Sequence, residues 1–467
     1  GDSLAATTVA TSLVQAGCQV TVADLFAAPT LEAFIVRARG KLTATPVASQ
    51  DAAPAAASAV VPAAATTAAP TAVSEPAAPT ATPLSGTSFP LTSLQQAYAL
   101  GADGVRGITC TTPAVGVIIS SGDGSALDPQ RFATLIAELT AAWEPLRCVR
   151  SGDNEQAVVD AATVPTAAPV LTLHAPTGAD LTTDSGVEAA LAALRAELSG
   201  QRIPLDAVPM VQVVAVEGLT THVGLSMNYL GLDARSIGVL FNTILDRYEG
   251  AADTFPVDPS AQPFYEYVQR ELAAGTAGYS ADHVSGYSAD ARPQQLPSAP
   301  SLPVTTKKWT ATSDARFSSL HTELSVADTR ALQTAAAHAG VTVSAVVLQA
   351  YGAVIAASSG LDVCGISVPI SQRPSTNTAQ QGSREVLGNF TELALCTLGT
   401  ESSVTDVHRT LGHIGDGTLP NSRDIARAGR AAYPVVFTST TGVAALHRSG
   451  TLTPSWVLTR TPGVQLD

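Results

Sequence analysis

Charged residues are scarce in this chain of 467 residues: Asp, Glu, Lys and Arg together make up 14%, against about 25% in an average soluble protein. Basic residues are the scarcer kind, because 25 Lys and Arg stand against 39 Asp and Glu and give a net charge of −14. Proteins that coat nucleic acid or an anionic membrane need clustered cations. The composition therefore argues against both kinds of partner.

Long apolar runs and a regular cysteine pattern are also missing. No stretch of about 18 apolar residues lacks a breaker, so the sequence predicts no membrane span. The chain opens on Gly1 and Asp2 without a basic and apolar leader, so we expect no signal peptide. The five cysteines are odd in number and widely scattered, which favours a reducing, cytoplasmic location. The eight histidines show no metal-ligand spacing, so no metal site is predicted.

The segment 43–84 differs in composition from the rest of the chain. Ala, Pro, Thr and Ser fill 34 of its 42 positions, and only Asp51 and Glu75 are charged. Prolines spread through the segment exclude a continuous helix, and a segment with so few large apolar side chains cannot form a core. We predict a disordered linker between a short first segment, 1–42, and the large remainder of the chain.

The large remainder alternates strand and helix signals. Apolar patterning predicts strands at 211–216, 223–227 and 363–370 and helices at 237–248 and 343–356. Ser325 has the position of a helix N-cap, and Gly340 is placed to close that helix. The pattern is mixed α/β and falls into two halves, 85–270 and 271–467.

The first 42 residues carry a different pattern. Apolar residues from Leu4 to Val14 recur at helical spacing, with Ser3 before them and Gly17 after them. Together with VTVADLFAAPTLEAF at 20–34, this resembles the last two-thirds of an acyl or peptidyl carrier protein, an all-α bundle whose first helix is missing here. The resemblance implies that a phosphopantetheinyl transferase attaches a 4′-phosphopantetheine arm to Ser3. A phosphodiester is favoured at a helix N-terminus.

Six segments of the remainder follow one another in the order of one family's motifs. They are FPLTSLQQAYALG at 89–101, WEPLR at 143–147, LPSAPSLP at 296–303, GNFT at 388–391, PVVFTS at 434–439 and TPGVQLD at 461–467. The set resembles condensation-type domains of nonribosomal peptide synthetases, and most of all their heterocyclization branch. Ala102 and Gly463 depart from that branch, which has Arg and Gln there. The resemblance implies a two-lobed α/β fold like that of chloramphenicol acetyltransferase.

A further segment, MNYLGLDARS at 227–236, distinguishes the branches. Ordinary condensation domains have His-His-x-x-x-Asp-Gly there, and no two histidines are adjacent in this chain. Heterocyclization domains have Asp-x-x-x-x-Asp-x-x-Ser, and this sequence has Asn228, Asp233 and Ser236. Asn keeps an acceptor oxygen but loses the charge of Asp. The family places an Arg-Pro on the opposing lobe, so we expect Asp233 to be a buried carboxylate paired with Arg373.

The resemblance also places the family's cyclodehydration pair at Thr438 and Asp467. It implies that an acyl thioester on a carrier condenses with carrier-bound Cys, Ser or Thr, and that the amide then closes to a thiazoline or oxazoline. Both steps move protons, so a carboxylate beside a hydroxyl suits the chemistry. The implied partners are carrier-bound acyl and aminoacyl thioesters, an adenylation domain and a downstream carrier. By analogy, the order of carrier and heterocyclization domain also occurs in siderophore assembly lines.

Two other interpretations stay open. Asn228, Ala102 and Gly463 favour a degenerate domain that only docks carriers, whereas Thr438 and Asp467 oppose that interpretation. An ordinary condensation domain that forms only amides is the third possibility, and the missing pair of histidines disfavours it.

Overall fold

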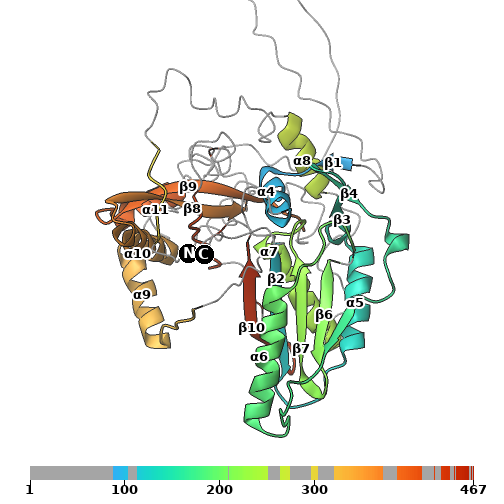
Figure 1. The fold of residues 1–467 in the computed structure, drawn as a ribbon. Helices are drawn as coiled ribbons and strands as arrows, with labels where there is room; N and C mark the ends of the chain where they lie inside the picture. Colours follow the sequence, from blue (N-terminus) through green and yellow to red (C-terminus); the bar gives the residue numbers. More distant parts are fainter. Residues whose placement is uncertain are drawn as a thin grey trace, which may run out of the picture.

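The computed structural model of the chain describes residues 88–103, 113–208, 210–250, 263–273, 296–302, 320–371, 387–412, 425, 433–441, 446, 449–461, 464 and 466–467 (Figure 1). The predicted carrier segment 1–42 with Ser3 and the predicted linker 43–84 lie outside the described residues. Arg373, the predicted partner of Asp233, also lies outside them.

The first lobe contains a sheet of five strands in the order β10-β2-β7-β6-β5 (Figure 1). Its strands are β2 (Ala114–Ser121), β5 (Val170–Leu173), β6 (Val211–Val216), β7 (Leu219–Asn228) and β10 (Leu452–Arg460). All neighbouring strands run antiparallel except β5 and β6. The strands predicted at 211–216 and 223–227 are confirmed as β6 and part of β7.

Helices cover both faces of this sheet. They are α5 (Pro129–Ala142), α6 (Asp184–Gly200) and α7 (Ala234–Tyr248), the last of which confirms the helix predicted at 237–248. Because side chains alternate along a strand, Val117 of β2 packs in the core formed with α5 and α7, whereas its neighbour Ile118 packs with Leu194 and Leu198 of α6. A sheet covered in this way needs strands that are apolar on both sides, which explains the apolar runs of β6 and β7.

A small sheet and several short helices complete the first lobe. They are β1 (Ser88–Pro90), β3 (Cys148–Arg150) and β4 (Glu155–Val158), in the order β1-β4-β3, with α4 (Ser93–Ala102), α8 (Pro263–Ala273) and the 3-10 helices η2 (Glu144–Arg147) and η3 (Ala161–Thr163). Thr92 and Gln95 form a capping box that starts α4. Phe89 of β1 and Phe264 of α8 share a small core with Phe390.

The second lobe consists of a two-stranded sheet and three helices. These elements are β8 (Val363–Ser371), β9 (Thr391–Gly399), α9 (Val326–His338), α10 (Val343–Ser358) and α11 (Val404–Gly412). The predicted strand at 363–370 and the predicted helix at 343–356 are confirmed as β8 and α10. Ser325 caps α9 by accepting a hydrogen bond from the N–H of Asp328, and Gly340 follows the helix with a φ of 66°, so the predicted helix ends are also confirmed.

The last strand crosses between the two halves of the chain. β10 comes from the second half, 271–467, yet it pairs antiparallel with β2 in the sheet of the first lobe. The predicted boundary at residue 270 therefore does not separate the two lobes completely, because β10, which follows it in sequence, belongs to the sheet of the first lobe.

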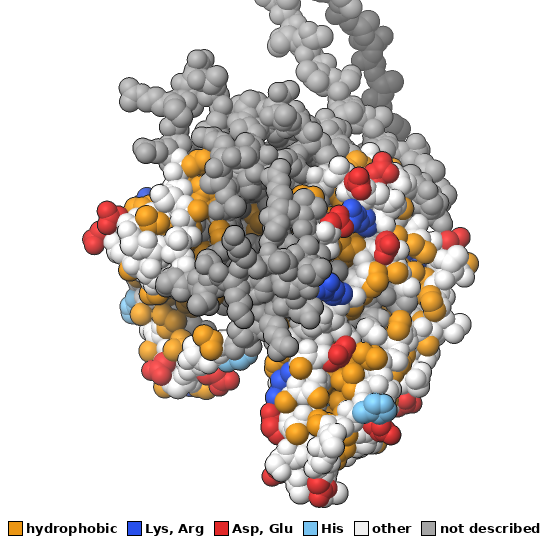
Figure 2. Space-filling view, in the orientation of Figure 1, with side chains coloured by type: hydrophobic (Ala, Val, Ile, Leu, Met, Phe, Trp, Pro, Cys, Tyr) orange, Lys and Arg blue, Asp and Glu red, His pale blue; other side chains and the backbone are white. Residues whose placement is uncertain are grey.

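The described surface fits the scarcity of charge. Among the described residues drawn in colour in Figure 2, Lys and Arg side chains are few and scattered over the visible face.

No single helix among the described residues is long and apolar enough to cross a membrane, and α9 and α10, which meet at 100°, pass that test only as a bent pair.

Glu144 gives the fold a pH-dependent component of stability. Desolvation raises the pKa of this carboxyl to about 7, although the charge of Arg147 opposes the shift. Because the folded state holds the proton over a range where the unfolded chain loses it, this stability is present below pH 4.5 and is lost as the pH rises towards 7.

We therefore expect the unfolding free energy of Glu144→Gln, relative to that of the wild type, to increase by about 1–2 kcal/mol as the pH rises from 4 to 8. This value is reduced because the Glu144 side chain is partly exposed to solvent. Urea denaturation at both pH values measures the change, with the exposed Glu155→Gln as the matched control. Parallel pH curves for the wild type and Glu144→Gln would contradict the assignment.

Candidate active site

The motif at 227–236 lies where β7 ends and α7 begins. Asn228 is the last residue of β7 and pairs with Ala114, the first residue of β2. Asp233 is the N-cap of α7, and its side chain accepts a hydrogen bond from the N–H of Ser236 at 2.9 Å. The motif is therefore a short connection whose two ends are fixed by a strand pair and by a helix cap.

Asn228 is buried and uses both polar atoms of its side chain. Its Nδ2 donates to the carbonyl oxygen of Pro204 at 2.8 Å, and its Oδ1 accepts from the N–H of Leu230 at 3.2 Å. An ionised Asp could fill the acceptor role but not the donor role. The amide at this position is thus matched to the loop that contains Pro204.

Asp233 and Ser236 connect the two lobes. The predicted burial of Asp233 is confirmed, since it is 4% exposed. The Ser236 hydroxyl lies 2.9 Å from Asp233 Oδ1 and 3.0 Å from the carbonyl oxygen of Gly388, and the Gly388 N–H donates back to it at 3.1 Å. The Ser371 hydroxyl, at the end of β8, donates to Asp233 Oδ2 at 3.4 Å. The N-terminus of α7 is therefore bonded to two segments of the second half of the chain.

The segment at 388–391 holds the same motif from the other side. Gly388 has a φ of 156°, and a Cβ there would lie 2.7 Å from the ring of Phe390, so this position requires glycine. The buried Asn389 side chain donates to the carbonyl oxygens of Leu230 and Tyr229 at 3.1 and 3.4 Å. Sequence reasoning matched this segment to a motif but did not foresee that Asn389 holds the backbone of the motif at 227–236.

Thr438 and Asp467 are brought together as predicted. The Thr438 hydroxyl donates to Asp467 Oδ1 at 2.6 Å. The approach depends on backbone pairing nearby, because Val435 bridges Leu466 and the Val436 N–H donates to the Leu466 carbonyl at 2.8 Å. Thr438 and Asp467 are both exposed residues among those described. Their catalytic role stays a prediction.

The surroundings shift the ionisation of Asp467. Desolvation raises the pKa of its carboxyl above the ordinary value, and the hydrogen bonds from Thr438 oppose that rise. Two tyrosine hydroxyls, of Tyr229 and Tyr351, lie within electrostatic range of the carboxylate. Sequence reasoning did not predict a role for either tyrosine. The only signal in the sequence was a phenol hydroxyl in each of two mostly apolar stretches.

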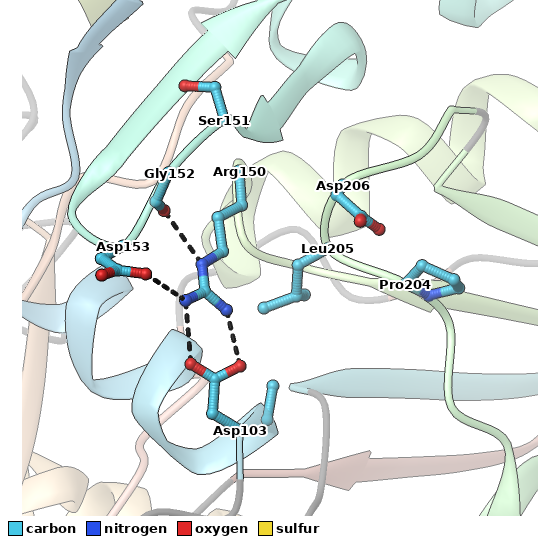
Figure 3. Close-up of a pocket in the computed structure, with 9 residues that line it drawn as sticks. Asp103, Arg150, Ser151, Gly152, Asp153, Pro204, Leu205 and Asp206 are labelled. Atoms are coloured by element: carbon cyan, nitrogen blue, oxygen red, sulfur yellow. Dashed lines mark hydrogen bonds and ion pairs between the residues drawn. The ribbon is translucent and has the colours of Figure 1, made fainter.

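A pocket lies one loop away from Asn228 (Figure 3). Its volume is about 430 Å³, and its lining includes Pro204, the residue to which Asn228 donates. Arg150 projects into it and forms two parallel bonds with Asp103 at 2.7 and 2.8 Å. Ala102, which stands where the heterocyclization branch has Arg, also lines the pocket. Thr438 and Asp467 are not part of its lining.

These features define a two-lobed α/β protein whose candidate catalytic groups lie where the halves of the chain meet. The sequence matches the Condensation domain family over residues 119–397, more than half of the chain. The chain belongs to this family, whose members are acyl-transferring enzymes that work on carrier-bound substrates.

Solved structures share this fold. The EpoB NRPS cyclization-docking bidomain from Sorangium cellulosum aligns with a TM-score of 0.62 and 23% identity over 81% of this chain and 75% of its own. The nonribosomal peptide synthetase FmoA3 aligns with a TM-score of 0.58 and 21% identity, over 81% and 40%. The condensation domain of the Monacolin K polyketide synthase MokA aligns with a TM-score of 0.54 and 14% identity, over 80% and 86%. No curated protein matches the chain. The predicted two-lobed condensation fold is confirmed.

We expect Asn228→Asp to destabilise the protein, although it restores the residue of the heterocyclization branch. An ionised carboxylate cannot donate to Pro204 and brings a charge against its carbonyl oxygen. The loss in unfolding free energy should be about 1–3 kcal/mol at pH 7 and smaller at pH 4, where a protonated acid can donate. Chemical denaturation at both pH values measures it, with the exposed Asn154→Asp as the control. Equal stability of Asn228→Asp and the wild type at pH 7 would show that the donor role is unimportant.

We expect Asp233→Ala to cost about 3 kcal/mol of unfolding free energy, because it removes a helix cap and the acceptor of several buried hydrogen bonds. The matched control is Asp128→Ala, which removes only the exposed cap of α5 and should cost about 1 kcal/mol. Denaturation of both variants by urea tests the difference. If the two variants lose the same stability, Asp233 acts as a helix cap and does not couple the lobes.

Proposed function

We propose that this condensation domain belongs to a nonribosomal peptide synthetase and is a heterocyclization domain. It condenses a carrier-bound acyl group with carrier-bound Cys, Ser or Thr and closes the product to a thiazoline or oxazoline. The observation that carries the proposal is the 2.6 Å hydrogen bond between the side chains of Thr438 and Asp467. The similarity in fold to a cyclization-docking bidomain supports it.

The first step is amide formation. The free amine of the acceptor amino acid attacks the carbonyl carbon of the acyl thioester, so that a C–N bond forms and the C–S bond breaks. The proton lost by the amine passes to the departing thiolate of the donor carrier. Most of this step is the placement of two thioesters next to each other in the right orientation.

The second step is ring closure with loss of water. The side-chain sulfur or oxygen of the new residue attacks the amide carbonyl carbon, and Asp467 accepts the proton that the nucleophile gives up. The former carbonyl oxygen then leaves as water, which takes up the proton held by Asp467 and the proton that the amide nitrogen loses as the C=N bond forms. Thr438 orients the Asp467 carboxylate by its hydrogen bond, and desolvation, which raises the pKa of that carboxyl, favours its uptake of the proton that it later returns to the leaving oxygen.

The carrier segment belongs to the same proposal. On the resemblance of residues 1–42 to carrier proteins, a phosphopantetheinyl transferase attaches 4′-phosphopantetheine to Ser3, and the arm presents the acyl group as a thioester. The segment 43–84 gives the carrier the reach to visit other domains of the synthetase, among them an adenylation domain and a downstream carrier.

A degenerate docking domain is the second candidate. One observation favours it. Position 228 has an amide where the heterocyclization branch has a carboxylate, and both polar atoms of the Asn228 side chain are already bonded to backbone groups. An amide-forming condensation domain is distinguished from both by its product, which is an open amide and no ring.

We expect Thr438→Ala and Asp467→Asn to keep amide formation and to lose ring closure, because proximity drives the first step whereas the second needs a proton-transfer group. Loss of such a group slows its step by about 10²–10⁴-fold. Mass spectrometry of the carrier-bound product distinguishes the open amide from the ring, since the amide is heavier by one water. The control is Ser439→Ala, which removes the neighbouring hydroxyl, bonded to Ser344 and Thr441.

Three results would overturn this proposal. Ring formation at the wild-type rate by both variants would remove Thr438 and Asp467 from the mechanism. An open amide as the only product of the wild type would instead identify the domain as one that forms amides alone, and no product at all would favour the docking domain.

A further inference from the structure

Tyr229 lies within the motif at 227–236 and is contacted by three other segments of the chain. It is 7% exposed, and its ring meets the ring of Tyr98 on α4 edge to face, with centroids 5.4 Å apart. Its N–H donates to the carbonyl of Pro113, and its carbonyl accepts from Asn389. The phenol is therefore held in one place by α4, by the start of β2 and by the segment at 388–391.

The hydroxyl of Tyr229 contacts the end of β10. It donates to the carbonyl oxygen of Arg460 at 2.7 Å, and it lies 2.8 Å from the hydroxyl of Thr461, which can donate to it in turn. Burial raises the pKa of the Tyr229 phenol well above its ordinary value, so the hydroxyl keeps its proton and remains a donor at any physiological pH. One hydroxyl thus fixes the last residue of β10 and the residue after it.

Asp467 follows Thr461 closely in the chain, and the described residues Thr461 and Leu466 are each held by a hydrogen bond. Near Asp467 the anchor is the hydrogen bond from the Val436 N–H to the Leu466 carbonyl, and the Tyr351 hydroxyl holds Val436 by its carbonyl at 2.9 Å. At the other end the anchor is Tyr229. The first anchor belongs to the same lobe as Thr438, whereas the second comes from the first half of the chain.

We propose that Tyr229 is a positioning residue for ring closure, which fixes the start of the segment 461–467 and so the geometry of the Asp467 carboxylate against Thr438. The inference rests on the proposed function and adds to it a residue that touches neither substrate nor carboxylate directly. A misplacement of about 1 Å at a catalytic group can slow a reaction about 10²-fold. Amide formation, which does not use the Asp467 carboxylate, is unaffected.

The test is Tyr229→Phe in the full chain, with Tyr248→Phe as the matched control. Tyr248 is also buried, and its hydroxyl accepts the N–H of Asp128 at 2.7 Å, so the control removes an equivalent hydrogen bond from the same lobe. The probes are benzoyl-pantetheine thioester as donor and cysteinyl-, seryl- and threonyl-pantetheine thioesters as acceptors. We expect Tyr229→Phe to form the open amide at the wild-type rate and to close the ring at least about 10-fold more slowly, with unchanged KM values, and Tyr248→Phe to close it normally.

Hydrogen exchange of the Val436 N–H gives a second readout that needs no ring product. In Tyr229→Phe it should exchange about 10-fold faster than in the wild type, because the segment that supplies its acceptor has lost one anchor, and in Tyr248→Phe it should not change. Unchanged exchange in Tyr229→Phe overturns the inference, and so does an equal slowing of both chemical steps, which marks a purely structural residue. A wild type that yields only the open amide overturns the proposed function, and this result differs from a failure of Tyr229 alone.

Discussion

The pairing of β10 with β2 is the interaction on which the rest of the candidate site depends. It inserts a strand from the last part of the chain into the sheet of the first lobe. The chain leaves this sheet at Arg460, beside the hydroxyl of Tyr229, and its next residues lead to Asp467. β10 and the hydrogen bonds between Ser236 and Gly388 hold the lobes together at two places. The Asp467 carboxylate and Thr438 therefore meet in a defined geometry.

Local patterns predicted the elements of the fold but not how they join. Strands such as 211–216 and the helix at 237–248 follow from the spacing of apolar residues, a property of a few consecutive positions. Thr438 and Asp467 could be paired only by resemblance, because no local signal relates residues brought together by a distant β-bridge. The donor role of Asn228 and the anchoring role of Tyr229 were missed for the same reason: their partners, Pro204 and Arg460, are set by tertiary packing.

Hydrogen bonds from neutral groups recur among the described residues of the site. Asp233, although buried, is met by hydroxyl and backbone donors from Ser236 and Ser371, and Asp467 is met by the hydroxyl of Thr438. Asn228 replaces a carboxylate by an amide and satisfies both of its polar atoms. Directional hydrogen bonds of this kind favour one arrangement of the groups that they join.

The pairing of β10 with β2 has a consequence for how the chain folds during its synthesis. Ser120 and Thr453, which are bonded across β2 and β10, are 333 residues apart in sequence. During synthesis β2 therefore leaves the ribosome long before its partner exists, and one of its edges waits unpaired. Unpaired edges recruit other strands, and such distant pairing forms slowly. The first sheet is consequently completed only after β10 has been synthesised, and until then one edge of β2 stays open.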